Sequence, residues 1–169
     1  MYRSAARAVA RTGLFICIVA TSGRAPAATA EKQRAAEGKP DFSGTWTRDV
    51  KRSENPLPSG ASTIVIEQTG SELKTRSAKD QASVERYRLD GGESVNEERD
   101  GTKSKSTARW DGEKLIVSSA VTPLTANPYT RTKTYSLASG GKELIIETAT
   151  VSAADRPLHF KQVWVRQEK

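Results

Sequence analysis

The chain has 169 residues, of which 36% are apolar, and a formal net charge of +7. This apolar content suffices for one modest core and argues against a second domain. Residues 1–30 hold four of the 27 basic residues and no acid, which leaves 23 basic against 20 acidic residues, alternating in sign, in the rest. That balance excludes the basic stripe by which proteins bind nucleic acid.

Residues 1–30 have the three-part pattern of a signal peptide. A segment with three arginines precedes an apolar run from Leu14 to Ala20, and small residues follow. Cleavage after Ala27 and cleavage after Ala30 fit the small-residue rule equally well. The apolar run is too short for a permanent membrane span, so the mature protein is expected to be periplasmic or secreted. Residues 31–40 are polar and are expected to form a flexible lead-in.

The mature chain offers little catalytic or metal-binding chemistry. The single cysteine, Cys17, lies in the predicted signal peptide, so disulfides and thiolate metal sites are not expected. The single histidine, His159, alternates with apolar neighbours and is expected to face outward. No G-x-S-x-G motif and no D-x-D-x-D-G calcium loop occurs. The sequence therefore predicts a protein that is not an enzyme and needs no metal or cofactor.

Residues 41–169 repeat one pattern and predict a single all-β domain. Runs rich in β-branched and aromatic residues alternate with short breaks that contain Gly, Asp, Asn or Pro. Because most breaks are tight turn sequences such as Asp90-Gly91 and Asp111-Gly112, consecutive strands are expected to be neighbours. We predict an antiparallel up-and-down meander of about ten strands that closes into a barrel, since closure removes exposed sheet edges. The predicted strands cover residues 44–48, 62–69, 72–77, 84–89, 94–99, 103–110, 114–120, 130–137, 143–151 and 158–166.

Alternation within the strands predicts which side chains face the barrel interior. Arg131, Lys133 and Tyr135 share a face with Leu137. If this face is interior, an arginine beside a tyrosine would suit a carboxylate head group; alternatively the barrel flares there and both cations reach water. The apolar interior candidates also include Ile64, Leu89, Leu115, Leu144, Leu158 and Trp164. The residues expected to line a ligand site are Trp46, Ile66, Tyr87, Trp110, Val117, Arg131, Tyr135, Ile146 and Phe160.

The segment Asp41-Phe42-Ser43-Gly44-Thr45-Trp46 resembles the opening of lipocalin-like domains, in which a Gly-x-Trp element starts the first strand. The resemblance, to exported bacterial lipocalin-like (calycin-type) small β-barrel domains, covers about residues 41–166. It implies that Trp46 fills one barrel end and that Arg166, on the last strand, packs across it. The similar pieces further along the chain are Leu89-Asp90-Gly91, Trp110-Asp111-Gly112, Tyr135-Ser136-Leu137 and Val163-Trp164-Val165-Arg166.

Two functions remain open at this level. The first is an exported, non-catalytic protein that binds a small hydrophobic or amphipathic ligand in its barrel. The alternative is an envelope interaction or structural module with a filled barrel and no small-molecule ligand. The resemblance implies a barrel more firmly than a ligand. Neither a nucleic acid nor a particular protein partner is indicated.

Overall fold

The computed structural model describes residues 38–54, 62–80, 83–152 and 157–168. The predicted signal peptide and most of the predicted lead-in lie outside the described residues. Within them, ten antiparallel strands form one sheet, with a short 3-10 helix, η1 (Ser139–Gly141), between the eighth and ninth strands. The strands are β1 (Gly44–Arg48), β2 (Thr63–Gln68), β3 (Glu72–Ser77), β4 (Val84–Arg88), β5 (Ser94–Glu97), β6 (Lys103–Asp111), β7 (Lys114–Thr122), β8 (Tyr129–Ala138), β9 (Glu143–Ser152) and β10 (Leu158–Arg166).

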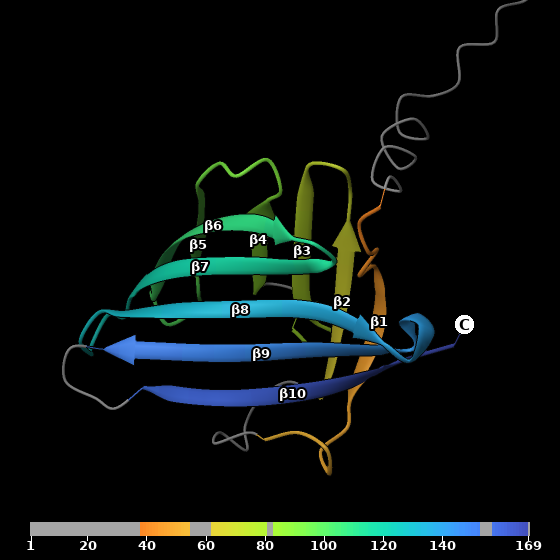
Figure 1. The fold of residues 1–169 in the computed structure, drawn as a ribbon. Helices are drawn as coiled ribbons and strands as arrows, with labels where there is room; N and C mark the ends of the chain where they lie inside the picture. Colours follow the sequence, from red (N-terminus) through yellow and green to blue (C-terminus); the bar gives the residue numbers. More distant parts are fainter. Residues whose placement is uncertain (1–37, 55–61, 81–82, 153–156, 169) are drawn as a thin grey trace, which may run out of the picture.

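The first strand of the chain, β1, pairs with the last strand of the chain, β10, in the curled sheet. The strand order is β4-β3-β2-β1-β10-β9-β8-β7-β6-β5, and the β1–β10 pairing sets Trp46 opposite Arg166. Figure 1 shows β6 to β10 crossing the front of the molecule, with β1 to β4 running steeply across them behind. The predicted all-β meander of about ten strands that closes into a barrel is confirmed, and each strand begins and ends within two residues of its predicted limits.

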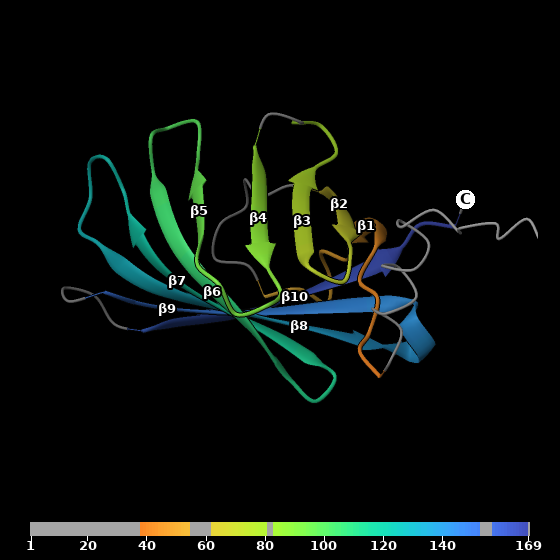
Figure 2. The ribbon, with the colours of Figure 1, turned by 90° about the horizontal axis from the view of Figure 1, so that it is seen from above.

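The step from β4 to β5 departs from the prediction that consecutive strands pair. These strands lie at the two ends of the sheet order and share no backbone ladder, although Figure 2 shows them side by side. Side chains of β5 bridge the seam instead. Asn96 Oδ1 accepts a hydrogen bond from the Arg86 N–H (2.7 Å), Asn96 Nδ2 donates to the Arg86 carbonyl (3.0 Å), and Ser94 Oγ accepts from the Arg88 N–H (2.8 Å). The Asp90-Gly91 turn therefore joins two strands without making them a hairpin.

The barrel core lies at the end where β1 begins. Trp46 is fully buried, and its indole Nε1 donates to the Phe42 carbonyl oxygen at 3.0 Å. The Phe42 ring stacks on Trp110, with the ring centroids 5.9 Å apart. The remaining buried members of this core cluster are Ile64, Ile66, Leu73, Tyr87, Ala108, Leu115, Val117, Tyr135, Leu144, Ile146 and Trp164.

Two predicted interior residues of β10, Leu158 and Phe160, lie outside this core cluster, and Phe160 is half-buried. Leu158 shares the inward face of β10 with Trp164 by alternation, but it is 55% exposed. It is the first residue of β10, opposite Thr150, and lies far along the strand from the buried Trp164. Alternation predicts the face to which a side chain points, but not how deep in the barrel it lies.

Candidate functional site

The barrel interior changes from apolar to polar along the strands. On β7 the inward residues are Leu115, Val117 and Ser119, followed by Val121, which is apolar again. Their β6 partners change in the same sense, from Trp110 opposite Leu115 to Ser106 opposite Ser119. The Ser106 and Ser119 hydroxyls form a buried hydrogen bond of 2.8 Å. The lumen is therefore amphipathic, which is the lining that suits a molecule with one apolar and one polar end.

Three charged side chains meet in the polar part of the lumen. Arg131 and Lys133 point inward from β8, and Glu85 points inward from β4. Glu85 Oε1 lies 3.1 Å from Arg131 Nη2, and Lys133 Nζ lies 2.9 and 2.7 Å from the two Glu85 carboxylate oxygens. Because β4 and β8 are not neighbours in the sheet, these ion pairs reach across the interior. The side chains of Arg131, Lys133 and Glu85 are 14, 18 and 25% exposed.

Burial and charge shift the acid–base behaviour of this cluster. Burial alone raises the pKa of Glu85, but the nearby Lys133 and Arg131 outweigh it and lower the pKa below its ordinary value. Burial lowers the pKa of Lys133, against the opposing pull of Glu85. Burial, together with the Glu85 charge, raises the pKa of Tyr87 and of Tyr135. Both phenol groups therefore stay protonated and can act as hydrogen-bond donors.

Two polar atoms of this region make no hydrogen bond of good geometry with the described residues, although the Tyr87 hydroxyl lies close enough to Glu85 to help lower the pKa of that carboxyl. They are the Tyr87 hydroxyl oxygen and Arg131 Nε, and both are buried. A buried polar group without a partner costs free energy, so native proteins satisfy almost all of them with protein, water or ligand atoms. These two atoms are therefore the natural contact points for a bound polar group.

The predicted lining residues are distributed over both parts of the interior. Trp46, Ile66, Tyr87, Val117, Tyr135 and Ile146 are buried in the core cluster. Trp110 packs against that cluster, Phe160 is half-buried on β10, and Arg131 belongs to the charged cluster. The residue that sequence reasoning missed is Glu85. It lies two positions before Tyr87, so the same alternation that placed Tyr87 inside also indicated Glu85.

The apolar barrel end is closed by a contact between the first and last strands. Arg166 Cζ lies 4.2 Å from the centre of the Trp46 ring, the packing that the lipocalin resemblance implied. The Arg166 guanidinium also donates to the carbonyls of Ser43 (2.6 Å) and Gly141 (2.9 Å). Gly44 makes room for it: its φ is +146°, and a Cβ there would lie 2.8 Å from Arg166 Nη1. The glycine before Trp46 is thus required by the approach of Arg166.

A separate cavity of about 270 Å³ lies on the outer face of β2, β3 and β4. Lys74 and Arg86 stand directly opposite each other in the β3–β4 register, and Arg76 lies beside them. Like charges directly opposed across two strands repel. Glu72 lies 3.1 Å from Lys74 Nζ and Glu67 lies 3.9 Å from Arg76 Nη2, so acids of the chain already offset part of this positive charge. The other lining residues are Val65, Glu67 and Val84.

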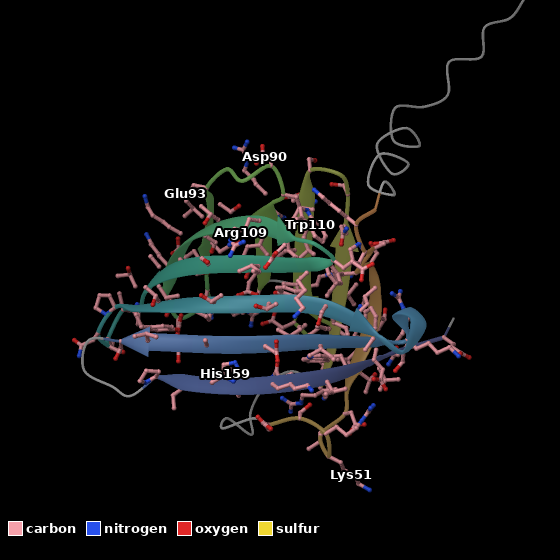
Figure 3. All side chains as sticks on the ribbon, in the orientation of Figure 1. Lys51, Asp90, Glu93, Arg109, Trp110 and His159 are labelled. Carbon is pink, nitrogen blue, oxygen red and sulfur yellow. The ribbon has the colours of Figure 1, made fainter. Side chains whose placement is uncertain are left out.

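The described residues show no arrangement typical of a metal site. No group of three or more His, Cys, Asp or Glu side chains among them is close enough to hold a metal ion. His159 on β10 is exposed, as predicted. Figure 3 labels it, and also labels Trp110 on β6 and Asp90 in the β4–β5 connection. Within the same part of the chain, no helix has the length and apolar character needed to cross a bilayer.

Comparison with known proteins relates the chain to others through its fold. No protein-family model matches it, and no curated protein matches it by sequence. Among solved structures, the REP1-NXSQ fatty acid transporter is similar with a TM-score of 0.55 and 16% identity, over 76% of this chain and 98% of the other. Apo lipid binding protein 8 of Caenorhabditis elegans is similar with a TM-score of 0.52 and 14% identity, over 75% of this chain and 95% of the other. At these identities the likeness concerns the fold alone: the chain and both proteins share the fold of an antiparallel β-barrel.

Proposed function

We propose that this chain is an exported, non-catalytic binding protein that holds one small hydrophobic or amphipathic molecule inside its barrel. The observation that carries the proposal is the amphipathic lumen, with an apolar end around Trp46 and Leu115 and a polar end at Arg131, Lys133 and Glu85. Small barrels that hold one ligand combine an apolar lining with a few polar anchors in this way.

The known proteins of the same fold support an apolar ligand. The two solved structures described above are a fatty acid transporter and a lipid binding protein. Their low identity to this chain transfers no residue roles. The proposal for this chain therefore depends on its own lumen, in which the buried Tyr87 hydroxyl and Arg131 Nε make no hydrogen bond of good geometry with the described residues.

Export is the second part of the proposal, and it depends on the amino-terminal sequence alone. A basic segment, a short apolar run and small residues stand in the order that a signal peptide requires. Fractionation of expressing cells, with the intact mass of the recovered protein, tests it. Export predicts a periplasmic or secreted product that has lost the first 27 or 30 residues, whereas an uncleaved product in the cytoplasm contradicts it.

Ligand binding is tested by native mass spectrometry of the mature protein, followed by titration with an uncharged, environment-sensitive fluorescent probe. Thr150→Trp adds a large ring to the lumen side of β9, opposite Arg131 in the register. Val151→Trp is the matched control, because Val151 lies on the outer face of the same strand and is 49% exposed. We expect saturable probe uptake at one site per chain, lost in the Thr150 variant and retained in the control. Urea unfolding establishes that both variants are folded.

The cavity on the outer face of β2 to β4 favours a second candidate function. Lys74, Arg76 and Arg86 line it and suit an anionic partner at the protein surface. This reading corresponds to an envelope interaction module whose barrel holds nothing. A protein that carries no molecule in native mass spectrometry and takes up no uncharged probe favours it over the ligand-binding barrel.

A further inference from the structure

The two cations of the charged cluster, Arg131 and Lys133, are already neutralised by carboxylates of the chain itself. Glu85 contacts both Arg131 and Lys133 at 3.1 Å or less, and Glu98 Oε1 lies 3.9 Å from Arg131 Nη1. Two positive charges therefore face two negative charges. A lumen that bound an anionic head group by charge would need a surplus of positive charge at this place, and the cluster has none.

Glu85 holds the position that a ligand carboxylate would have to take. Its carboxylate accepts hydrogen bonds from Lys133 Nζ and from one terminal nitrogen of Arg131, and both cationic side chains are less than one-fifth exposed. A second carboxylate beside Glu85 would be a like charge in a poorly hydrated space, which is strongly unfavourable. A ligand that displaced Glu85 from Arg131 and Lys133 would leave the Glu85 carboxylate, on β4, without a partner inside the barrel, which is unfavourable.

The groups that remain available are suited to an uncharged polar group. The Tyr87 hydroxyl and Arg131 Nε are buried, and neither makes a hydrogen bond of good geometry with the described residues. The hydroxyls of Ser106, Ser119 and Thr148 also lie on inward faces and are buried. Hydroxyl groups both donate and accept hydrogen bonds, so this set matches an alcohol, ester or amide.

We propose that Glu85 acts as an internal counter-ion that excludes anionic head groups, so that the barrel selects amphipathic molecules whose polar end is uncharged. This inference rests on the proposed ligand-binding function and specifies its substrate class. Glu85 is thereby the residue that determines specificity, acting through the charges of Arg131 and Lys133.

The test is a competition experiment on the mature protein, with the uncharged fluorescent probe as reporter. Dodecanol and laurate have the same chain length and differ in the head group, which is a hydroxyl in one and an ionised carboxylate in the other at neutral pH. We expect the wild-type protein to bind dodecanol at least about tenfold more tightly than laurate. In Glu85→Gln the affinity for laurate should rise by about tenfold or more, because two cations lose their carboxylate, while dodecanol changes little.

Two further variants control the experiment. Glu97→Gln makes the same charge change on the outer face of β5, where the side chain is 61% exposed, and should leave the preference for dodecanol intact. If Glu85→Gln does not fold, the triple variant Glu85→Gln/Glu98→Gln/Lys133→Gln removes two acids and one base together. That variant leaves no buried lysine without its partner, leaves Arg131 as a surplus positive charge, and should also gain affinity for laurate.

The outcomes separate this inference from the proposed function. If the reporter binds and wild-type protein prefers laurate, or if laurate affinity is unchanged when Glu85 is replaced, the selectivity inference is overturned while ligand binding stands. If the reporter does not bind the wild-type protein, the proposed function fails and the inference fails with it. Reporter binding, preference for dodecanol and the loss of that preference in the Glu85 variants together support both.

Discussion

The seam between β4 and β5 is expected to depend on one side-chain amide. Asn96 makes two hydrogen bonds to the backbone of Arg86, at 2.7 and 3.0 Å, and is only 7% exposed. Ser94 makes one hydrogen bond, to the N–H of Arg88. Asn96→Ala removes both contacts of the amide and leaves the N–H and the carbonyl of Arg86 without these partners.

The expected magnitude follows from the number of bonds lost. A hydrogen bond within a folded protein contributes about 1 kcal/mol net, with a range of about 0.5–1.5 kcal/mol. Asn96→Ala should therefore lower the free energy of unfolding by about 2 kcal/mol, and Ser94→Ala by about 1 kcal/mol. Val95→Ala is the matched control, since Val95 lies between them, points outward and is 64% exposed; its effect should stay within about 0.5 kcal/mol.

Urea unfolding followed by tryptophan fluorescence measures all three variants, and the denaturant slope should stay constant. Amide hydrogen exchange adds local information, because the Arg86 N–H should exchange faster in the Asn96 variant and the Arg88 N–H in the Ser94 variant. The reasoning is refuted if Asn96→Ala is no more destabilising than Val95→Ala, or if the protection of the Arg86 amide does not change. Either result would mean that something other than the Asn96 side chain joins β4 to β5.

Three further outcomes follow from buried groups. Trp46→Phe should lower the free energy of unfolding by about 2–3 kcal/mol, because the hydrogen bond to Phe42 is lost and the smaller ring leaves a cavity; a loss under about 1 kcal/mol in urea unfolding would contradict this. The pKa of Glu85 lies below its ordinary value of 4.5. The ionised Glu85 carboxylate therefore contributes its full stabilisation of the folded protein above pH 4.5, and this stabilisation is lost as the pH falls through the lowered pKa. The stability difference between wild-type protein and Glu85→Gln should therefore shrink in acid; urea titrations that give a constant difference argue against the lumen ion pairs. Ser106→Ala and Ser119→Ala should each cost about 1–2 kcal/mol, and the double variant less than their sum, because each single change leaves the other hydroxyl buried alone; additive costs in a double-mutant cycle would count against this pair.

Much of the fold could be predicted from sequence because each strand carries its own signal. Alternation of apolar and polar residues and turn dipeptides are local features, and they place all ten strands. The β4–β5 seam could not be predicted in this way, since Asp90-Gly91 has the sequence of a hairpin turn. Nothing local indicates that the side chains of Ser94 and Asn96 take the place of a backbone ladder there.

The candidate site was predictable only in part, for a related reason. Alternation placed Arg131 and Tyr135 on one face of β8, and the structure has that face inside the barrel. The partner of Arg131 is Glu85, on a strand that is not adjacent in the sheet. Such a contact depends on how far the sheet curls around the lumen, and curvature has no signature within a single strand. Alternation therefore indicated inward faces for the cations and for Glu85, but not that these side chains pair.

The contact that closes the barrel also constrains the order in which the protein can fold. Arg166 reaches the Ser43 carbonyl across 123 positions of sequence, whereas hairpins such as β2–β3 and β6–β7 join residues close in the chain. Local pairs form quickly, and pairs of distant segments form late. Until β10 has been synthesised, β1 and β9 each keep an unpaired edge that invites association with other chains. Arrival of the last strand pairs both of these edges at once, and the only sheet ends that then remain among the described strands are β4 and β5, which side chains of β5 join.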